Sequence, residues 1–315
     1  MVHRYGPSFQ SPKSCSRDLS TTSSSDAPSP QVLAAFQSLY ANTDGVAEEY
    51  AEMAAELASR FKGHPGAIGL ELHNEPVSPV DIDALDDFHR LVAGAIREAA
   101  PELHMAFEPD SLRNFTDVAS IEEVFPFDNA TYAPHLYTDV FEDGWIDQDE
   151  DKVAASLVAM FEEAEEHQSA LLVGEWGNDI RTEHGRRYVE LALELFDEHA
   201  ASWAFWVYEE YSQDSWGLYD PGPDDTRGSL REETADLLAR PFPERVEGRL
   251  EGSTWDGTQL TVRLVEGAGW HRITAPARVW PELPTATCDG QPASVKKGPP
   301  GRIDARCDGN LLLVE

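Results

Sequence analysis

Two glutamates lie at the ends of separate strand-like segments and could act as a pair. Glu75 lies in the tripeptide Asn74-Glu75-Pro76, shortly after the apolar run Ile-Gly-Leu-Glu-Leu. Glu175 lies in Gly-Glu-Trp-Gly, at the end of a second apolar run. Cleavage of a glycosidic bond needs one carboxyl group that donates a proton and another that acts as nucleophile or base. If the fold brings the two glutamates together, they predict this chemistry.

Other polar and aromatic side chains also follow apolar runs. The amide of Asn74 could bond a sugar hydroxyl next to the reacting carbon, an interaction that can strengthen as charge develops there. His135 and Tyr137, two residues apart, could hold the carboxyl groups in their protonation states. Trp206 offers an apolar surface for a sugar ring. Each of these residues taken alone is more often structural. Their occurrence in this order, each at the end of its own strand-like run, favours a functional site.

The segments that carry these residues alternate between strand-like and helical patterns. We expect strands at 67–73, 103–108, 130–136, 170–174 and 202–208, and helices at 32–40, 46–61, 81–100, 149–167, 183–199 and 229–239. Such alternation predicts parallel strands joined by helical crossovers. Because functional residues of α/β barrels lie at the carboxyl ends of the strands, the polar clusters should meet at one edge.

Composition divides the chain into three parts. Residues 1–29 are rich in Ser, Pro and Thr and are predicted to be disordered. Residues 30–242 carry the alternating pattern and form the predicted catalytic domain. Residues 243–315 contain strand-like runs at 259–265, 270–275 and 310–314 with Asp-Gly turns between them, which predicts a small all-β sandwich. We expect this last part to be a packed accessory rather than an independent binding module.

The charge of the chain limits its partners. It has 58 acidic and 24 basic residues, a formal charge of -34, and only five lysines among 315 residues. A chain with so little basic surface is a poor partner for nucleic acid. Self-repulsion of the acidic surface is relieved when salt screens it, so the composition predicts a halophilic, acidic protein.

The cysteines and the N-terminus add weaker indications. Cys15, Cys288 and Cys307 have no metal-ligand spacing; Cys288 and Cys307 could form a disulfide or stay free. No apolar stretch near Met1 is long enough for a signal peptide or a membrane span. The location is therefore left open: cytoplasmic if Met1 is the true start, secreted if it is not.

The ordered set of strand-end motifs resembles glycoside hydrolase family 5, a family of retaining enzymes with a (β/α)8 TIM barrel. The resemblance is closest to endoglycoceramidase-like members, covers the chain from about Pro28 to Pro243, and includes a C-terminal β-sandwich. The motifs are Asn74-Glu75-Pro76 after the fourth strand, Glu108-Pro109-Asp110 on the fifth, His135-x-Tyr137 after the sixth, Gly174-Glu175-Trp176-Gly177 at the seventh and Trp206 on the eighth.

The resemblance implies a role for each motif residue. Glu75 would be the acid/base and Glu175 the nucleophile of a double displacement, with Tyr137 positioning Glu175 and His135 contacting the acid/base or the sugar. The implied substrate is a β-linked glycan or glycolipid, and neither a metal nor a cofactor is required. Further aromatic residues could line sugar subsites or could equally pack in the core: Trp145, Trp176, Trp216 and Tyr219.

The chain departs from the family pattern at its beginning. Only 66 residues precede the strand that matches the fourth, whereas three strand–helix units need about 90. We therefore expect a barrel truncated to strands four to eight, with open edges that could self-associate. Strand alternation also places Glu71, His73 and Glu75 on one face. A non-catalytic carbohydrate-binding protein or a degenerate fragment is the alternative to an active enzyme.

Overall fold

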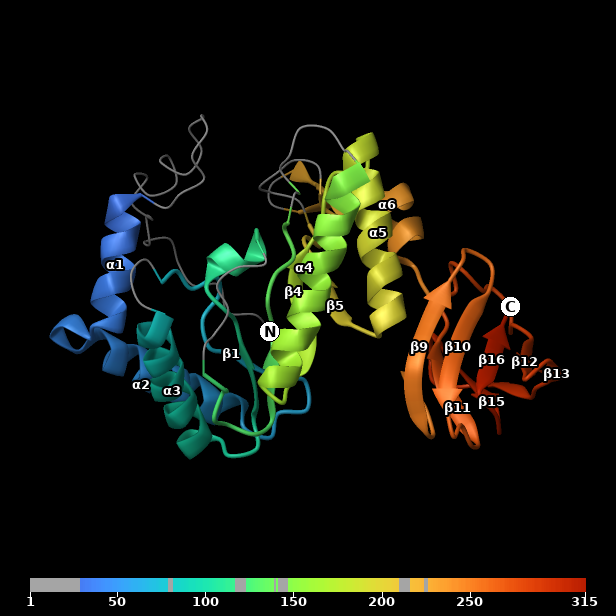
Figure 1. Ribbon diagram of the computed structural model, residues 1–315, viewed down its shortest axis with the longest axis horizontal. Helices are drawn as coiled ribbons and strands as arrows, with labels where there is room; N and C mark the ends of the chain where they lie inside the picture. Colours follow the sequence, from blue (N-terminus) through green and yellow to red (C-terminus); the bar gives the residue numbers. More distant parts are fainter. Residues whose placement is uncertain are drawn as a thin grey trace.

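The computed structural model describes residues 29–78, 82–116, 123–138, 140, 147–209, 216–223 and 226–315. These residues form a helix-covered parallel sheet and an antiparallel β region beside it (Figure 1). The N-terminal segment that was predicted to be disordered lies outside the described residues, as do Cys15 and Trp145. No helix among the described residues is long and apolar enough to cross a membrane.

A five-stranded parallel sheet confirms the predicted alternation. Its strands are β1 (Gly69–Glu71), β2 (His104–Phe107), β3 (Ala130–Tyr132), β4 (Ala170–Trp176) and β5 (Ser202–Phe205). They pair in sequence order, each parallel to the next. The sheet is the second half of a (β/α)8 barrel, and β1 and β5 each pair with a single neighbour among the described strands.

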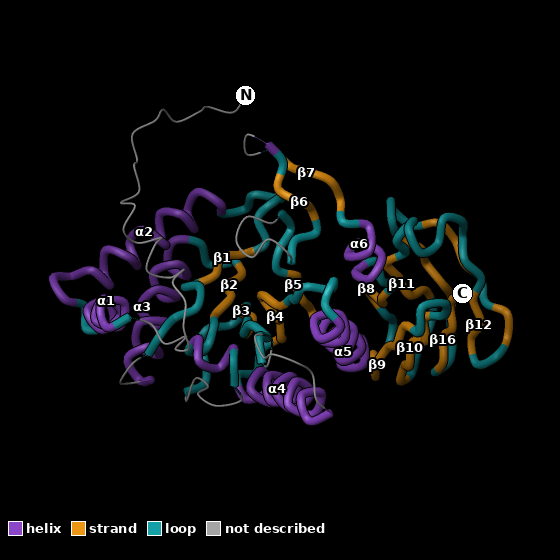
Figure 2. Tube along the Cα trace, turned by 90° about the horizontal axis from the view of Figure 1, so that it is seen from above, coloured by secondary structure: helices purple, strands orange, loops and turns teal. Residues whose placement is uncertain are grey.

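The helices lie on the outer side of this half-barrel (Figure 2). They are α1 (Pro30–Tyr40), α2 (Val46–Phe61), α3 (Ile82–Ala99), α4 (Asp147–Glu166), α5 (Glu183–His199) and α6 (Glu232–Leu238). The sequence periodicity predicted each of them to within a few residues. Buried alanines on one face of α2, such as Ala51 and Ala58, allow it to pack closely on α3, while Met53, Leu57 and Phe61 on its other side are exposed.

A buried polar network ties the sheet to α4. Arg113 is fully buried, and its guanidinium donates to Glu163 Oε1 at 2.8 Å and to the Ser156 carbonyl at 2.9 Å. The Tyr132 hydroxyl donates to Glu163 Oε2 at 2.6 Å. Buried charges are tolerated when they are paired in this way, so the network holds the helix in a specific register against β3.

The strand alternation expected beyond β1 is not observed. The strand ends at Glu71; the Leu72 amide still donates to the Ala106 carbonyl of β2 at 2.9 Å, and the chain leaves the sheet after it. The His73 ring packs edge-on against Phe36, Tyr50 and Phe88 of the helices, with Nδ1 3.2 Å from the Tyr50 hydroxyl. The prediction that His73 shares the face of Glu71 was therefore wrong, because the strand ends two residues earlier than the apolar run suggested.

The C-terminal region consists of two antiparallel sheets that share one apolar core. One sheet has the order β13-β12-β16-β10-β9 and the other β14-β15-β11-β8. Their bounds are β8 (Phe242–Arg245), β9 (Arg249–Trp255), β10 (Leu260–Val265), β11 (Trp270–Thr274), β12 (Ala286–Cys288), β13 (Gln291–Pro292), β14 (Val295–Lys297), β15 (Arg302–Arg306) and β16 (Leu311–Val314). This is the predicted sandwich, with several short strands that the sequence pattern did not reveal.

The C-terminal half of the chain also contains a disulfide, which the sequence had left as one of two alternatives, and a hairpin that was not predicted. Cys288 and Cys307 form a disulfide with an S–S distance of 2.06 Å, so the paired alternative holds. A short hairpin of β6 (Tyr219–Pro221) and β7 (Arg227–Leu230) lies between β5 and α6 and was not predicted. The sandwich contacts the half-barrel at α5, where the Ser253 hydroxyl donates to the Asp197 carbonyl at 3.1 Å.

Candidate active site

The carboxyl ends of β1, β3 and β4 bring three of the predicted site residues together. His135 Nδ1 lies 2.9 Å from Glu75 Oε1 and 3.6 Å from Glu175 Oε2. One side-chain atom from each of Glu75, His135 and Glu175 lies within 4.8 Å of the others. Residues from distant parts of the sequence thus converge because parallel strands end at the same edge of the sheet.

Glu75 is held by the segment that follows β2. Its backbone is left-handed, with φ 47°, and its Oε1 accepts a hydrogen bond from Asn114 Nδ2 at 3.3 Å. Asn114 is fully buried; its side-chain oxygen accepts the His135 amide at 3.0 Å and its carbonyl accepts the Tyr137 amide at 2.8 Å. Asn114 thus joins three predicted site residues, although the sequence analysis did not identify it.

The Glu108-Pro109-Asp110 motif provides the local structure that positions Asn114. Asp110 caps the 3₁₀ helix Ser111–Asn114 by accepting the Leu112 amide at 2.8 Å. The Asp110 carboxylate also accepts the Ser78 amide, and the Ser111 amide donates to the Pro76 carbonyl at 2.7 Å. The motif therefore fixes the loop after Glu75 against the loop after β2.

Glu175 is partly buried and is held by Tyr137. The Tyr137 hydroxyl donates to Glu175 Oε2 at 2.9 Å. Burial raises the pKa of the Glu175 carboxyl; the Tyr137 hydrogen bond partly offsets this, and Glu75 adds to it. Gly174 makes room for the imidazole, because a Cβ at this position would lie 3.2 Å from two atoms of the His135 ring.

Two more carboxyl groups surround the same imidazole. Glu108, at the end of β2, is fully buried, and its Oε2 lies 3.4 Å from His135 Nε2. Burial, and next the neighbouring Glu71, raise the pKa of Glu108 to about 10. Glu71, at the end of β1, is exposed as a residue, but loss of water around its carboxyl group, followed by the Glu175 and Glu75 charges, raises its pKa as well. Glu108 belongs to a predicted strand-end motif, but its sequence position alone indicated no role for it.

The predicted aromatic residues take different positions. Trp216 is buried, with its ring centroid 6.1 Å from that of Tyr137, so it lies next to the carboxyl pair. Trp206 follows β5, is partly exposed, and donates its backbone amide to the Trp176 carbonyl at 2.8 Å. Asn74 is exposed beside Glu75. These three remain candidates for substrate contacts.

Trp176 does not face the carboxyl pair. Its ring is fully buried and packs edge-on against Phe196, Trp203 and Phe205, with centroid distances of 4.9, 5.3 and 5.2 Å. Side chains alternate along β4, so Trp176 points to the helices when Glu175 points to the opposite face. The predicted substrate contact of Trp176 is corrected accordingly: the packing alternative holds.

A comparison with protein-family models decides the family. The model described as cellulase (glycosyl hydrolase family 5) matches residues 25–212, more than half of the chain. The chain belongs to glycosyl hydrolase family 5. This family of glycoside hydrolases is the one that the strand-end motifs resembled.

Individual relatives agree with the family assignment. Endoglycoceramidase of Cyanea nozakii is 26% identical over 245 residues, which cover 71% of this chain and 46% of the relative. The endo-glycoceramidase II structure from Rhodococcus sp. in complex with ganglioside GM3 has a TM-score of 0.71 and 21% identity, over 90% of this chain and 67% of that one. An endogalactoceramidase structure has a TM-score of 0.73 and 20% identity, over 90% and 66%. The chain thus spans less than half the length of the curated relative.

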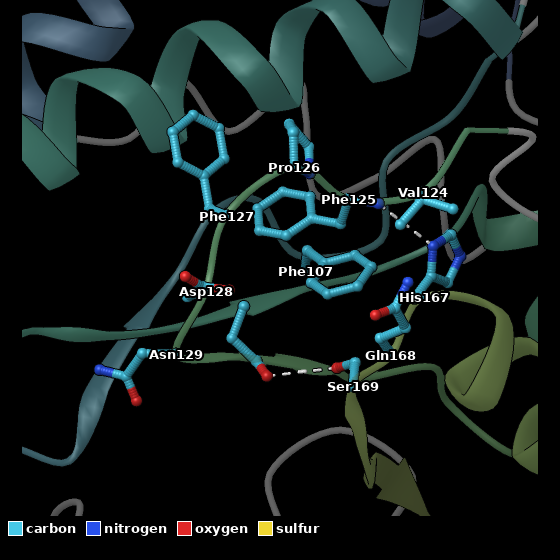
Figure 3. Close-up of a pocket in the computed structure, with 11 residues that line it drawn as sticks. Phe107, Val124, Phe125, Pro126, Phe127, Asp128, Asn129, His167, Gln168 and Ser169 are labelled. Carbon is cyan, nitrogen blue, oxygen red and sulfur yellow. Dashed lines mark hydrogen bonds between the residues drawn. The ribbon is translucent and has the colours of Figure 1, made fainter.

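A cavity elsewhere in this family 5 chain is separate from the carboxyl cluster (Figure 3). It has a volume of about 250 Å³ and is lined by Phe107, Val124, Phe125, Pro126, Phe127, Asp128, Asn129, Ala130, His167, Gln168 and Ser169. Its residues 128–130 and 167–169 lie at the amino ends of β3 and β4. Because family 5 chemistry is expected at the carboxyl ends, this cavity lies at the wrong end of the sheet for it.

The carboxyl cluster also has the donor types of a metal site. Glu75, His135 and Glu175 could each offer one ligand atom to a divalent cation. The ligand oxygens, however, already accept hydrogen bonds: Glu75 Oε1 from Asn114 and Glu175 Oε2 from Tyr137. Carboxyl groups held by such donors suit the proton transfer and nucleophilic attack of family 5 chemistry, for which no metal is needed.

Proposed function

We infer that this chain carries the catalytic pair of a retaining glycoside hydrolase that cleaves β-glycosidic bonds of glycans or glycolipids. Glu75 is the acid/base and Glu175 the nucleophile. The observation that carries the proposal is the meeting of these two carboxyl groups across His135, with side-chain oxygens within 4.8 Å and with Tyr137 donating to Glu175.

Retaining enzymes have carboxyl groups about 5 to 5.5 Å apart, whereas inverting enzymes leave about 6.5 to 9.5 Å for a water. The short separation supports retention.

The reaction follows from the two environments. Glu175 attacks the anomeric carbon while Glu75 donates its proton to the glycosidic oxygen, so the leaving alcohol departs neutral and a glycosyl-enzyme ester forms. Glu75 then removes a proton from water, which attacks the same carbon and releases Glu175. Tyr137 keeps one Glu175 oxygen engaged, so the other is free to attack. Asn114 and His135 fix Glu75 through its Oε1.

Relatives support a glycolipid as the substrate class. Endoglycoceramidase is the name of the curated relative, and ganglioside GM3 is the ligand in one structure of similar fold. Trp216 and Trp206 lie near the carboxyl pair and offer apolar rings for sugars. Another β-linked glycan, such as cellulose or mannan, would use the same pair with different subsites.

The open side of the half-barrel suggests a requirement for further strands. Beside the unpaired edge of β1, Ile68 is 90% exposed, and Met53, Leu57 and Phe61 of α2 are exposed as well. Such a surface favours association with additional strand–helix units or with a second copy of the chain. Concentration-dependent sedimentation, compared between the chain and a Leu57→Glu variant, tests this: a monomer at every concentration would contradict it.

The acidic composition supports a dependence on salt. The net charge of -34 creates repulsion that screening reduces. The midpoint of thermal unfolding should therefore rise from dilute to molar salt. A midpoint that does not change over this range would refute a halophilic protein.

Rescue by azide tests the assigned roles separately. Hydrolysis of an aryl β-glycoside should fall in Glu75→Ala and in Glu175→Ala, whereas the exposed glutamate variant Glu165→Gln should keep wild-type rates. Azide should restore turnover of Glu75→Ala to a β-glycosyl azide, because the nucleophile is intact, and of Glu175→Ala to an α-glycosyl azide, because attack is then direct. Equal near-zero rates for wild type and Glu75→Ala would favour a non-catalytic carbohydrate-binding protein.

A further inference from the structure

We propose that Glu108 is a positioning residue: as a neutral carboxylic acid it donates a hydrogen bond to His135 Nε2 and thereby directs the His135 Nδ1 proton to Glu75. The consequence for catalysis rests on the proposed function of Glu75. The hydrogen bond itself does not, and it can be tested without turnover.

The geometry links three groups through one ring. The His135 ring is buried between two carboxyl groups, with Nε2 3.4 Å from Glu108 Oε2 and Nδ1 2.9 Å from Glu75 Oε1. Within the part of the chain that the structure describes, both Glu108 oxygens are buried without a hydrogen bond of good geometry. The Glu71 carboxyl group and the Glu75 backbone amide also face Glu108. We assign the Glu108 proton to Oε2, the oxygen nearest His135 Nε2, so that the imidazole is its partner.

The surroundings of Glu108 keep its carboxyl group neutral. The titratable groups that face it are Glu71 and Glu75 from β1 and the loop after it, and Tyr132 and His135 from β3 and the loop after it. None of these groups brings a permanent positive charge, and two of them are carboxyl groups. Ionisation at a fully buried position among other acids is costly, so the carboxyl group retains its proton and has an O–H to donate.

The donor role of Glu108 determines the state of the imidazole. A neutral imidazole has one N–H donor and one acceptor nitrogen. If Nε2 accepts from Glu108, the proton must lie on Nδ1, where it donates to Glu75 Oε1. If Glu108 were ionised instead, both nitrogens would face carboxylates and the imidazolium would be favoured. The two states predict different spectra and different responses to mutation.

The arrangement also distinguishes the two oxygens of Glu75. Oε1 accepts hydrogen bonds from both His135 Nδ1 and Asn114 Nδ2. An oxygen that accepts two donors is a poor site for a proton, so the proton that Glu75 delivers belongs on Oε2. Glu108 therefore acts through His135 to aim the acid/base group, without touching the sugar.

Two substitutions of Glu108 separate these states. A Gln side chain keeps the size and can donate an N–H to Nε2, as a protonated carboxyl group does; a Met side chain has similar length but no donor. Glu108→Gln should keep kcat/KM within about threefold of wild type, whereas Glu108→Met should lose about 10- to 100-fold, mainly in kcat. A loss in Glu108→Gln as large as that in Glu108→Met would overturn the proposal.

The tautomer of His135 provides the readout that needs no activity. In ¹⁵N-histidine-labelled chain, with the His135 resonances assigned from a His135→Gln spectrum, wild type and Glu108→Gln should both show a neutral ring with its proton on Nδ1. An imidazolium, or a proton on Nε2, in folded wild type at neutral pH would refute the assignment. This comparison stands even if Glu108→Met does not fold or if the chain does not hydrolyse glycosides, because it requires only folded wild type and Glu108→Gln.

Discussion

The half-barrel and the C-terminal sandwich bury different kinds of groups. The half-barrel encloses several charged and polar side chains, among them Arg113, Glu108 and His135, whereas the sandwich core is built mainly from apolar residues such as Val262, Leu312 and Val314. The sandwich also buries His271, but this ring is bonded to the Glu247 amide and the Cys307 carbonyl. Apolar packing is the simpler way to stabilise a fold, because buried polar groups cost free energy unless each is paired. The polar interior of the half-barrel therefore points to chemistry, and the apolar interior of the sandwich to support.

Loss of the proposed nucleophile, Glu175, should have the largest effect and should be confined to activity. In Glu175→Gln the side chain keeps its size and can still pair with Tyr137, but it cannot form the glycosyl ester. We expect kcat to fall about a thousand-fold or more, with unchanged unfolding of both regions. Steady-state kinetics with an aryl β-glycoside and circular dichroism check this; wild-type kcat in the variant would refute the assigned nucleophile.

Removal of the buried guanidinium should destabilise the half-barrel most. Arg113→Ala leaves Glu163 buried without its cation, which we expect to cost about 3 to 5 kcal/mol. The matched control is Arg272→Ala in the sandwich, whose pair with Asp304 is partly exposed and should contribute much less. Urea unfolding followed by hydrogen exchange in each region measures both. Similar costs for the two variants would contradict the contrast between the regions.

Loss of the disulfide should destabilise the sandwich instead. Cys288 and Cys307 are 19 residues apart, and a loop of this size predicts about 3 kcal/mol of stabilisation. In the double variant Cys288→Ser and Cys307→Ser, hydrogen exchange should accelerate in β10, β12 and β16 and much less in β1–β4. Equal acceleration in the parallel sheet would mean that the two regions unfold as one unit.

The smallest of these effects should come from the hydroxyl that holds the nucleophile. Tyr137→Phe removes a hydrogen bond to the Glu175 carboxylate, which we expect to lower kcat/KM by about 10- to 100-fold. Because this bond lowers the pKa of Glu175, its loss should raise that pKa, and the acidic limb of the pH profile should move to higher pH. An acidic limb that stays in place or moves to lower pH would refute this role of Tyr137.

Local patterns predicted much of the fold and part of the site. The helical periodicity of residues 183–199 coincides with α5, and the parallel order of the five strands follows from their alternation with helices. The meeting of Glu75, His135 and Glu175 was predictable because the carboxyl ends of parallel strands share an edge. The disulfide could only be left as one of two alternatives, because spacing does not reveal the distance between two strands.

The remaining features depend on contacts that no local pattern encodes. Asn114 lies in a segment without regular periodicity, and its importance comes from three partners far away in the sequence. The end of β1 at Glu71, and hence the direction of His73, depends on where pairing with β2 stops. Trp176 follows Glu175 in sequence, but only the packing of α5 on β4 shows that it belongs to the core.

The junction at α5 limits how the chain could be divided. Phe196 packs on Trp176, which follows Glu175 on β4. The next residue, Asp197, forms an ion pair with Arg240, and its carbonyl accepts a hydrogen bond from the Ser253 hydroxyl of the sandwich. A chain shortened before Arg240 would leave the buried Asp197 carboxylate without its cation, next to the strand that bears Glu175. The half-barrel therefore extends at least to Arg240: a fusion protein that carries the half-barrel would need to include this residue to keep the Asp197 carboxylate paired.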